Sequence, residues 1–363
     1  MSDETQILGA SREIWRDLFR KFDAVMRLSP WKWFGKADSF AIHPAGSAEP
    51  FFIHACEPVS AEGKGMSIIY GWAGDALFRR LRAGMPHAMT RSFEIPFVLC
   101  ALRETASVTE LEKNVAKEAG VDVEGRAEIP VFVSFRPGWM PWHLGRTETE
   151  STVKVLDQAL GVFLRCENDK DIVYPRRPGI VWVRRQRTAG GKWEEGWANL
   201  RPFVEPFADR AMEVPEKSLE TLAALPDDMP AIELATDVIP KIALLNPGTV
   251  KLRGEDGRVP LGYFFAISPY GVDTPPGEVK DNGVFYPAGD IGSLRKFFPN
   301  MLVKYFLSKG HRPREIVVSS PRMMDILRPL QLRVRFKTTF HEKLPNYDRI
   351  HALVSKVVAD RVK

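Results

Sequence analysis

The sequence has few cysteines and no long apolar run. Its three cysteines, Cys56, Cys100 and Cys166, lie far apart and form no CxxC pair. This spacing excludes a disulfide framework and a cysteine metal site, so we expect free thiols that are buried at Cys56 and Cys100. No stretch approaches the roughly 18 apolar residues of a membrane helix, and the first ten residues lack the features of a secretion signal. We therefore expect a cytoplasmic protein that does not contact a membrane.

The common signatures of enzymes and cofactor sites are also missing. The seven histidines form no HExxH or HxH pair, and the chain has no GxSxG, GxGxxG or GxxxxGK[ST] segment. These motifs supply zinc ligands, a nucleophilic serine and loops that bind nucleotide phosphates. We therefore predict no catalytic residue, no metal site and no cofactor, although a site assembled from distant residues would escape this test.

The charge of the chain is unevenly distributed. The formal net charge is +5, yet residues 301–363 contain 14 Lys and Arg against 5 Asp and Glu. The rest of the chain is slightly acidic. A basic surface attracts nucleic acid and other polyanions, although many basic surfaces are only solvated. A polyanionic partner is thus one function that the composition leaves open.

The N-terminal half combines amphipathic helices with short apolar strands. Residues 11–28 carry apolar side chains at helical spacing, with Ser11 as the N-cap, and SFAIHP, PFFIHACEPV and GMSIIYGW follow as strands. A helix over 75–82 comes next, and Asp75 at its start would repel a bound phosphate. This pattern predicts an antiparallel sheet covered by helices.

Two later helices are predicted from capping boxes, in which a Ser or Thr side chain and a Glu three residues later satisfy the first helical N–H groups. Ser107 with Glu110 forms the first box, and Thr147 with Glu150 forms the second. Each pair precedes apolar residues at helical spacing.

The segment PGWMPWHLGRTETEST, residues 137–152, concentrates aromatic side chains before the second capping box. The simplest interpretation makes Trp139, Trp142 and His143 a rigid aromatic plug where a strand meets a helix. The alternative is a ligand-binding shelf, because aromatic side chains on a stiff loop make good contact surfaces. Catalysis by His143 has no support from a nearby nucleophile.

A second candidate segment, DIVYPRRPGIVWVRRQR, interleaves aromatic residues with Arg176, Arg177, Arg184 and Arg185. Arginines beside aromatic rings can hold single-stranded nucleic acid or phosphates. Arginines on an edge strand can equally serve to prevent aggregation, and the sequence favours this second interpretation.

The chain between Glu205 and Pro240 is rich in Pro, Asp and Glu, which is typical of a linker. We therefore predict a domain of residues 1–207, a linker of residues 208–239 with one short helix, and a domain of residues 240–363.

The C-terminal domain is predicted to contain three strands, then a helix, a strand, a helix, a strand and a helix. The segments before the first helix are KIALLNP, the hairpin-like TVKLRGEDGRVPLGYFFAIS around Asp256 and Gly257, and DNGVFYPAG. The helix 291–309 follows, and then the segments EIVVSS, PRMMDILRPL, VRFKTTF and NYDRIHALVSKVV. The whole chain is thus expected to be an α+β protein of two domains, with a mixed sheet in the second.

Parts of the sequence resemble known families. PVFVSFRPGWMPWHLGRTETESTVKVLDQAL and GMSIIYGWAGDALFRRL resemble elements of a bacterial domain of unknown function. In that family a second uncharacterised domain typically follows, and HRPREIVVS and EKLPNYDRI are similar to its elements. The resemblance implies a tandem of two domains without an assigned activity.

The order of elements in the C-terminal domain also resembles the ribonuclease H-like fold. Active members of that group hold two metal ions on carboxylates from the first strand, the first helix and the end of the fourth strand. Here the predicted first strand offers Lys241 and Asn246, the helix offers Arg295, and the fourth strand ends in Ser319-Ser320. We therefore expect a ribonuclease H-like domain that lacks the metal-binding acids.

Three functional hypotheses follow from these observations. The first is a non-enzymatic binding or regulatory module whose partner is a protein or a polyanion. The second is a nucleic-acid-binding protein that uses the arginine-rich segment and the basic C-terminal surface. The third is an enzyme of a type that the sequence motifs do not reveal.

Overall fold

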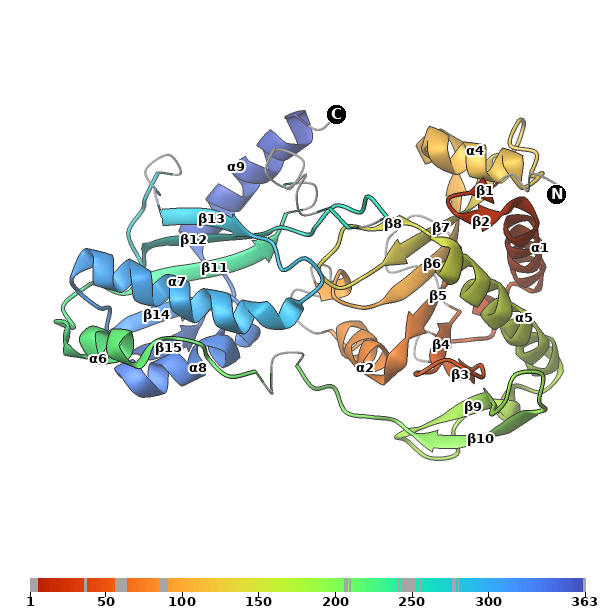
Figure 1. Ribbon diagram of the computed structural model, residues 1–363, viewed down its shortest axis with the longest axis horizontal. Coiled ribbons are helices and arrows are strands. Elements are labelled where there is room, and N and C mark those ends of the chain that lie inside the picture. Colours follow the sequence, from red (N-terminus) through yellow and green to blue (C-terminus); the bar gives the residue numbers. More distant parts are fainter. Residues whose placement is uncertain are drawn as a thin grey trace. The chain divides into compact units, whose positions relative to one another are not determined.

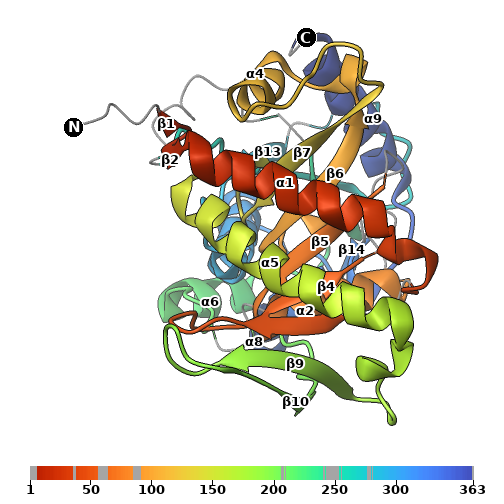
Figure 2. The same ribbon diagram turned by 90° about the vertical axis from the view of Figure 1, so that its right-hand side faces the viewer.

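A computed structural model of the chain provides the fold (Figures 1 and 2). It describes residues 6–35, 38–55, 64–84, 91–205, 208, 210–239, 242, 253–254, 256–275, 279 and 281–361. The chain divides into two compact units. Unit 1 consists of Met1–Met85, Ile95–Arg136 and Pro141–Phe203, and unit 2 of Pro86–Glu94, Pro137–Met140 and Val204–Lys363.

Unit 1 is built on an eight-stranded sheet in the order β10-β9-β3-β4-β5-β6-β7-β8. The strands are β3 (Phe40–His43), β4 (Phe51–His54), β5 (Gly65–Tyr70), β6 (Phe97–Glu104), β7 (Glu128–Phe135), β8 (Trp142–His143), β9 (Ile180–Gln186) and β10 (Trp193–Asn199). All neighbouring strands are antiparallel except β3 and β9, which are parallel. The predicted antiparallel sheet is therefore mixed, because a long connection through a helix returns β9 beside β3. A separate two-stranded sheet pairs β1 (Gln6–Ile7) with β2 (Ala10–Ser11).

Helices cover both faces of this sheet. On one face α1 (Arg12–Leu28) lies beside α5 (Arg146–Asn168), as Figure 2 shows. The ring of Phe132 on β7 meets Phe19 and Phe22 of α1 with centroids 5.0 and 5.5 Å apart. On the other face α2 (Gly71–Arg82) packs Trp72 against Phe52 of β4 at 5.0 Å. Alternate residues of each strand thus enter two separate apolar layers.

Of the three predicted N-cap residues, one is confirmed and two are wrong. Ser11 caps α1, as predicted, and its hydroxyl accepts the Ile14 N–H. The helix α4 (Glu110–Glu118) is capped by Thr109 with Glu112, so the pair Ser107 and Glu110 is wrong. Several Ser, Thr and Glu residues in a row allow more than one box, and only the packing of the helix selects the register.

The start of α5 is also earlier than predicted. Gly145 is its N-cap residue, and the Gly145 N–H donates to the Glu148 carboxylate at 3.1 Å. Ser134 and Arg136 donate to the same carboxylate. Burial raises the pKa of Glu148, but these hydrogen bonds outweigh burial and lower it. Thr147 and Glu150 therefore lie inside the first turns and do not cap the helix.

Unit 2 contains a five-stranded mixed sheet in the order β13-β12-β11-β14-β15. The strands are β11 (Ile232–Val238), β12 (Tyr263–Pro269), β13 (Asp281–Phe285), β14 (Glu315–Val318) and β15 (Lys337–Phe340). β12 is antiparallel to both β11 and β13, whereas β11, β14 and β15 are mutually parallel. The α+β class is thus confirmed for the chain.

Among the described elements, this sheet is accompanied by the helices α6 (Glu216–Ala224), α7 (Leu294–Lys309), α8 (Pro321–Val334) and α9 (Pro345–Arg361). Residues of α6, α7 and α8 form one apolar cluster with Leu234, and residues of α9 form another with Ala235. Leu234 and Ala235 are neighbours on β11, so the central strand is buried on both sides. No described helix is both long and apolar enough to span a bilayer.

The first strand of this sheet lies where the sequence predicts a linker. Residues 208–239 contain the expected short helix, α6, but they also contain β11. The predicted first strand, KIALLNP, lies outside the described residues apart from Ile242. β11 was missed because it carries Glu233 and Asp237 and follows a Pro-rich and acidic stretch, a composition that favours a linker.

Glu233 gives β11 a pH-dependent contribution to stability. Its Oε1 accepts from Ser268 Oγ at 2.7 Å and from Tyr347 N at 3.0 Å, yet burial outweighs these bonds and raises the pKa of Glu233. A raised pKa means that the protonated form is favoured in the folded state. The resulting stability is complete below the unfolded-state pKa of about 4.3 and is lost as pH rises through the folded-state pKa.

Glu233→Gln should remove this dependence. We expect the free energy of unfolding of the wild type to fall relative to that of the variant as pH rises from about 4 to about 7. Urea unfolding over a pH series measures the difference, with the exposed Glu342→Gln as the control. A difference between wild type and Glu233→Gln that does not change with pH would contradict the account.

Candidate functional site

The aromatic segment does not form the single plug that the sequence suggests. Trp139 belongs to unit 2, whereas Trp142 and His143 form β8 of unit 1. Trp139 packs closely on Gly289: a Cβ atom on residue 289 would lie only 2.9 Å from the Nε1 atom of Trp139. Backbone hydrogen bonds on either side, Leu261 N–H to Gly138 O and Met140 N–H to Val259 O, both 2.8 Å, hold the segment in place. Trp139 therefore completes the packing of unit 2.

Trp142 and His143 pack in unit 1. Their rings meet edge to face at 5.0 Å, and His143 lines a shallow cavity between α1, α4 and β7 together with Trp15 and Phe132. The cavity has a volume of about 20 Å³, which is room for about one water molecule. These two residues are placed for packing, and the cavity is too small for an organic ligand.

Arg184 is held by neighbouring side chains. Its Nε donates to Gln158 Oε1 at 3.0 Å, and its guanidinium pairs with Glu195 on β10. Arg165 makes a bidentate pair with the same carboxylate at 2.9 and 3.0 Å. Burial raises the pKa of Glu195, but the two arginines outweigh burial and lower it. Arg184 is thus neutralised, and β10 rather than β9 is the edge strand.

Arg176 and Arg177 are exposed and differ from Arg184 in this respect. They lie between Pro175 and Pro178 in the loop that precedes β9, and no described residue forms an ion pair with them. Arg185 is likewise exposed, on the face of β9 opposite to Arg184. Three of the four predicted arginines are therefore accessible.

Tyr174 connects the arginine loop to a segment far away in the sequence. Its hydroxyl donates to Asp38 Oδ2 at 2.7 Å and lies 3.2 Å from Trp33 O. Burial, with the neighbouring Asp38, raises the pKa of Tyr174 to about 12, so the hydroxyl stays protonated at neutral pH. The loop of Arg176 and Arg177 is thereby fixed beside the chain that follows α1.

That second segment carries its own cation and aromatic rings. Lys32 is exposed, and Trp31 and Trp33 are partly buried on either side of it. Trp33 is anchored edge to face against Phe34 and Phe163, at 5.3 and 6.0 Å. The aromatic contacts among the described residues do not include Trp31, so its ring is not part of this anchored stack.

We call the combined region the tyrosine-linked surface and define it by six residues. Its cations are Lys32, Arg176 and Arg177, and its aromatic residues are Trp31, Trp33 and Tyr174. Lys32 and the two tryptophans are not among the residues that the sequence singles out as candidates. The signal was present, since SPWKWF has a lysine between two tryptophans and YPRRP has two arginines close to a tyrosine, but only the fold brings the two stretches together.

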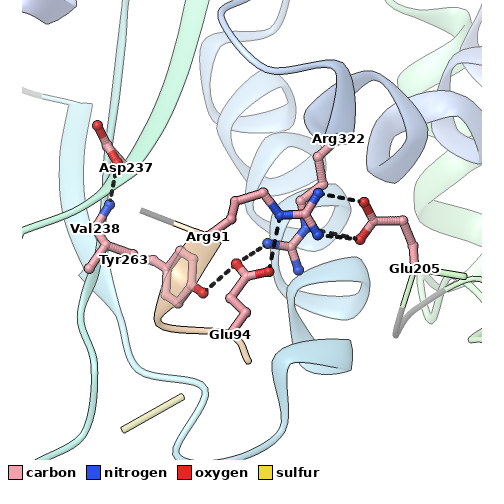
Figure 3. A network of polar contacts seen from close by, with 7 residues as sticks. All are labelled: Arg91, Glu94, Glu205, Asp237, Val238, Tyr263 and Arg322. Atoms are coloured by element: carbon pink, nitrogen blue, oxygen red, sulfur yellow. Dashed lines mark hydrogen bonds and ion pairs between the residues drawn. The ribbon is translucent and has the colours of Figure 1, made fainter. Parts of the chain in front are cut away.

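Unit 2 buries an ionic network, shown in Figure 3. Glu94 accepts from Tyr263 Oη at 2.8 Å, from Arg91 Nε at 3.3 Å and from Arg322. Arg91 in turn binds both oxygens of Glu205, at 2.8 and 2.9 Å. Burial raises the pKa of Glu94, but Arg322, Arg91 and Tyr263 outweigh burial and lower it. The positive charges of the two arginines equal the negative charges of the two carboxylates. We therefore assign the network to the stability of unit 2.

A buried histidine–aspartate pair lies in unit 1. His54 Nε2 is 3.1 Å from Asp75 Oδ1, and Asp75 Oδ2 accepts from Arg79 Nε at 2.8 Å. Asp75 lies in the second turn of α2, not at the helix start that the sequence predicts. Among the described residues, no hydroxyl or thiol donates to His54. The pair orients the imidazole without activating a described nucleophile.

Unit 2 carries acids on its first strand. The sequence predicts a different first strand, which offers Lys241 and Asn246 in place of acids. Glu233 and Asp237 lie on β11, but both are engaged. Glu233 binds Ser268 and the start of α9, and Asp237 Oδ1 accepts its neighbour's N–H, from Val238, at 2.7 Å. Within the part of the chain that the structure describes, no three His, Cys, Asp or Glu side chains gather as metal ligands.

The described cysteines are buried thiols. Burial raises the pKa of Cys100, and burial with nearby charges raises that of Cys166 to about 11. The expectation of a buried thiol is thus confirmed for Cys100, whereas Cys56 lies outside the described residues.

Comparison with known proteins finds a family match for one part of the chain. Residues 15–184 match the model of a domain of unknown function (DUF7309). This segment, which runs from α1 into β9, is therefore similar to that uncharacterised domain, in agreement with the resemblance noted for the N-terminal half. Neither the curated proteins nor the solved structures contain a match.

Proposed function

We propose that the protein is a non-enzymatic binding module that recognises a polyanionic partner through the tyrosine-linked surface. One observation carries this proposal: the Tyr174 hydroxyl contacts Trp33 O and Asp38, which places Lys32 in the same region as Arg176 and Arg177. Three exposed cations without an ion-pair partner among the described residues are a favourable surface for several negative charges at once.

The local charge supports an anionic partner. Residues 171–199 contain six Lys and Arg and three Asp and Glu. Two of these acids, Glu194 and Glu195, pair with Arg187 and Arg184 in the β9–β10 hairpin. Four cations, Arg176, Arg177, Arg185 and Lys192, thus remain against the third acid, the exposed Asp171. Long-range attraction of this kind speeds encounter with a polyanion and weakens as salt is added.

We propose further that unit 2 is a ribonuclease H-like scaffold that serves binding rather than hydrolysis. The strand order β13-β12-β11-β14-β15, with β12 reversed, supports that chain path. The acids of β11 are occupied by protein donors, the first helix after the three strands carries Arg295, and β14 leads into Ser319-Ser320. Among the described residues of unit 2, the donors that a magnesium pair needs are therefore not combined there.

Removal of the three cations should weaken polyanion binding. The triple variant Lys32→Ala, Arg176→Ala, Arg177→Ala is expected to lose affinity for heparin by about tenfold or more, because each lost cation removes an ionic contact. Elution from immobilised heparin in a salt gradient measures the change. Tyr174→Phe should show a smaller loss, since it frees the loop without removing charge.

The matched control is Arg126→Ala, which removes an exposed arginine in the loop before β7. Its elution should stay that of the wild type. Equal elution of the wild type and the triple variant would refute the proposed surface. A loss in Arg126→Ala of about a third of the triple variant's, in proportion to the one cation removed, would show that only net charge matters.

A further inference from the structure

We infer that the polyanion is a single-stranded nucleic acid, and that Trp31 supplies the surface on which a base stacks. This inference rests on the proposed function and adds the class of partner. Other polyanions present charge alone, whereas an unpaired nucleotide presents a phosphate and a flat ring together. The tyrosine-linked surface pairs exposed cations with aromatic side chains in the same way.

The two tryptophans of the surface have different roles. Trp33 is committed to the core, because its ring packs on Phe34 and Phe163 and its carbonyl is 3.2 Å from the Tyr174 hydroxyl. Trp31 is partly exposed and takes part in none of the aromatic pairs of the described residues. A partly exposed ring next to Lys32 can stack on any base, since every base has a π-face.

The loop that carries the arginines is stiff before any ligand binds. Pro175 and Pro178 fix their own φ angles and restrict the residues that precede them, Tyr174 and Arg177, to extended conformations. Tyr174 is also tied to Asp38 at 2.7 Å. Little conformational entropy is therefore lost when the loop engages a strand.

The shape of the surface disfavours a duplex. The cations and rings lie on a short 3₁₀ turn, Pro30–Lys32, and on the loop before β9. Duplex readers insert a helix or a two-stranded ribbon into the major groove, and neither carries these side chains. Flipped-out or unpaired bases are what a loop bearing an aromatic ring can reach.

The inference is tested by fluorescence anisotropy with the full-length protein and three probes. These are a labelled 15-nucleotide dT strand, the corresponding dA·dT duplex, and vesicles of phosphatidylcholine with phosphatidylserine. We expect the single strand to bind more tightly than the duplex at equal salt. Trp31→Ala should weaken single-strand binding about tenfold, the loss of one stacked base, while leaving heparin elution unchanged.

Trp31→Phe is the matched variant, because it keeps an aromatic face and should retain most of the single-strand affinity. Unchanged heparin elution of Trp31→Ala shows that the surface is still folded. If heparin binds but the single strand binds no more tightly than the duplex, the inference is overturned and the proposed function is kept. The same holds if Trp31→Ala does not change the affinity for the single strand. Binding to vesicles with no binding to the oligonucleotide overturns it in favour of a lipid surface. Failure of heparin and of all three probes would remove both proposals.

Discussion

Glu94→Gln is expected to destabilise unit 2 by about 3–5 kcal/mol, because the change leaves buried arginines without their full counter-charge. Glu94 is only 6% exposed to solvent, and its carboxylate accepts hydrogen bonds from Tyr263, Arg91 and Arg322. Glutamine keeps one acceptor oxygen but removes the negative charge. Chemical denaturation followed by far-ultraviolet circular dichroism measures the free energy of unfolding.

Two variants separate this effect from weaker ones. Glu110→Gln removes an exposed carboxylate that pairs with Lys113, so the free energy of unfolding should stay close to that of the wild type. Tyr263→Phe removes only one donor from the charged Glu94 and should cost about 1.5–3 kcal/mol. A Glu94→Gln protein as stable as Glu110→Gln would contradict the role assigned to the network.

The network also predicts acid sensitivity. The pKa of Glu94 is lowered in the folded state, so its stabilising contribution is present above the unfolded-state value of about 4.3. This contribution is lost as pH falls through the lowered folded-state pKa. Glu94→Gln should therefore lose less stability on acidification than the wild type.

An isolated fragment of residues 204–363 is expected not to fold cooperatively. Unit 2 also includes Pro86–Glu94 and Pro137–Met140, which come from earlier in the chain. The fragment lacks Glu94, the buried partner of Arg322, and it lacks Phe93 and Met140, which pack on the apolar cluster of α6, α7 and α8. An unpaired buried arginine costs several kcal/mol, which is a large part of a domain's stability.

Amide hydrogen exchange of β11 gives the measurement for the fragment. In the full-length protein these amides should be protected, and in the fragment they should exchange at nearly unfolded rates. The control is the same fragment with Arg322→Met, Tyr263→Phe and Glu205→Leu, in which the side chains that lose Glu94 or Arg91 are apolar and protection should return in part. Equal protection of β11 in the unmodified fragment and in the full chain would show that unit 2 folds by itself.

The sequence predicts much of the regular structure because the decisive signals are local. The helix α1 follows from the spacing of Trp15, Phe19 and Phe22, all of which are buried. Boundaries were less accurate, since the overlapping Ser, Thr and Glu residues before α4 and α5 permit more than one capping pair. Local chemistry allowed these choices, and packing decided among them.

β11 could not be recognised from its own residues. Glu233 and Asp237 make it polar, and Glu233 is buried only because Ser268 and the first turn of α9 supply hydrogen bonds from elsewhere in the chain. Tertiary contacts of this kind override strand propensity. The same holds for Glu94, whose partners Tyr263 and Arg322 are 169 and 228 residues away.

The sequence identified only part of the candidate surface. Arg176 and Arg177 were identified, but Arg184 was not separated from them, although hairpin pairing places Glu195 opposite Arg184. Lys32 and Trp31 were missed because their proximity to Arg176 depends on Tyr174 contacts that span more than 130 residues. A search for basic residues between aromatic ones would have found both stretches without joining them.

The slope of log K against log salt concentration for polyphosphate binding tests the central claim most directly, because it counts ionic contacts. Each neutralised phosphate contributes about 0.7 to this slope for a flexible single chain. The account predicts that the triple variant Lys32→Ala, Arg176→Ala, Arg177→Ala lowers the slope by about 2, whereas Arg126→Ala leaves it unchanged. Equal slopes for the wild type and the triple variant would contradict it.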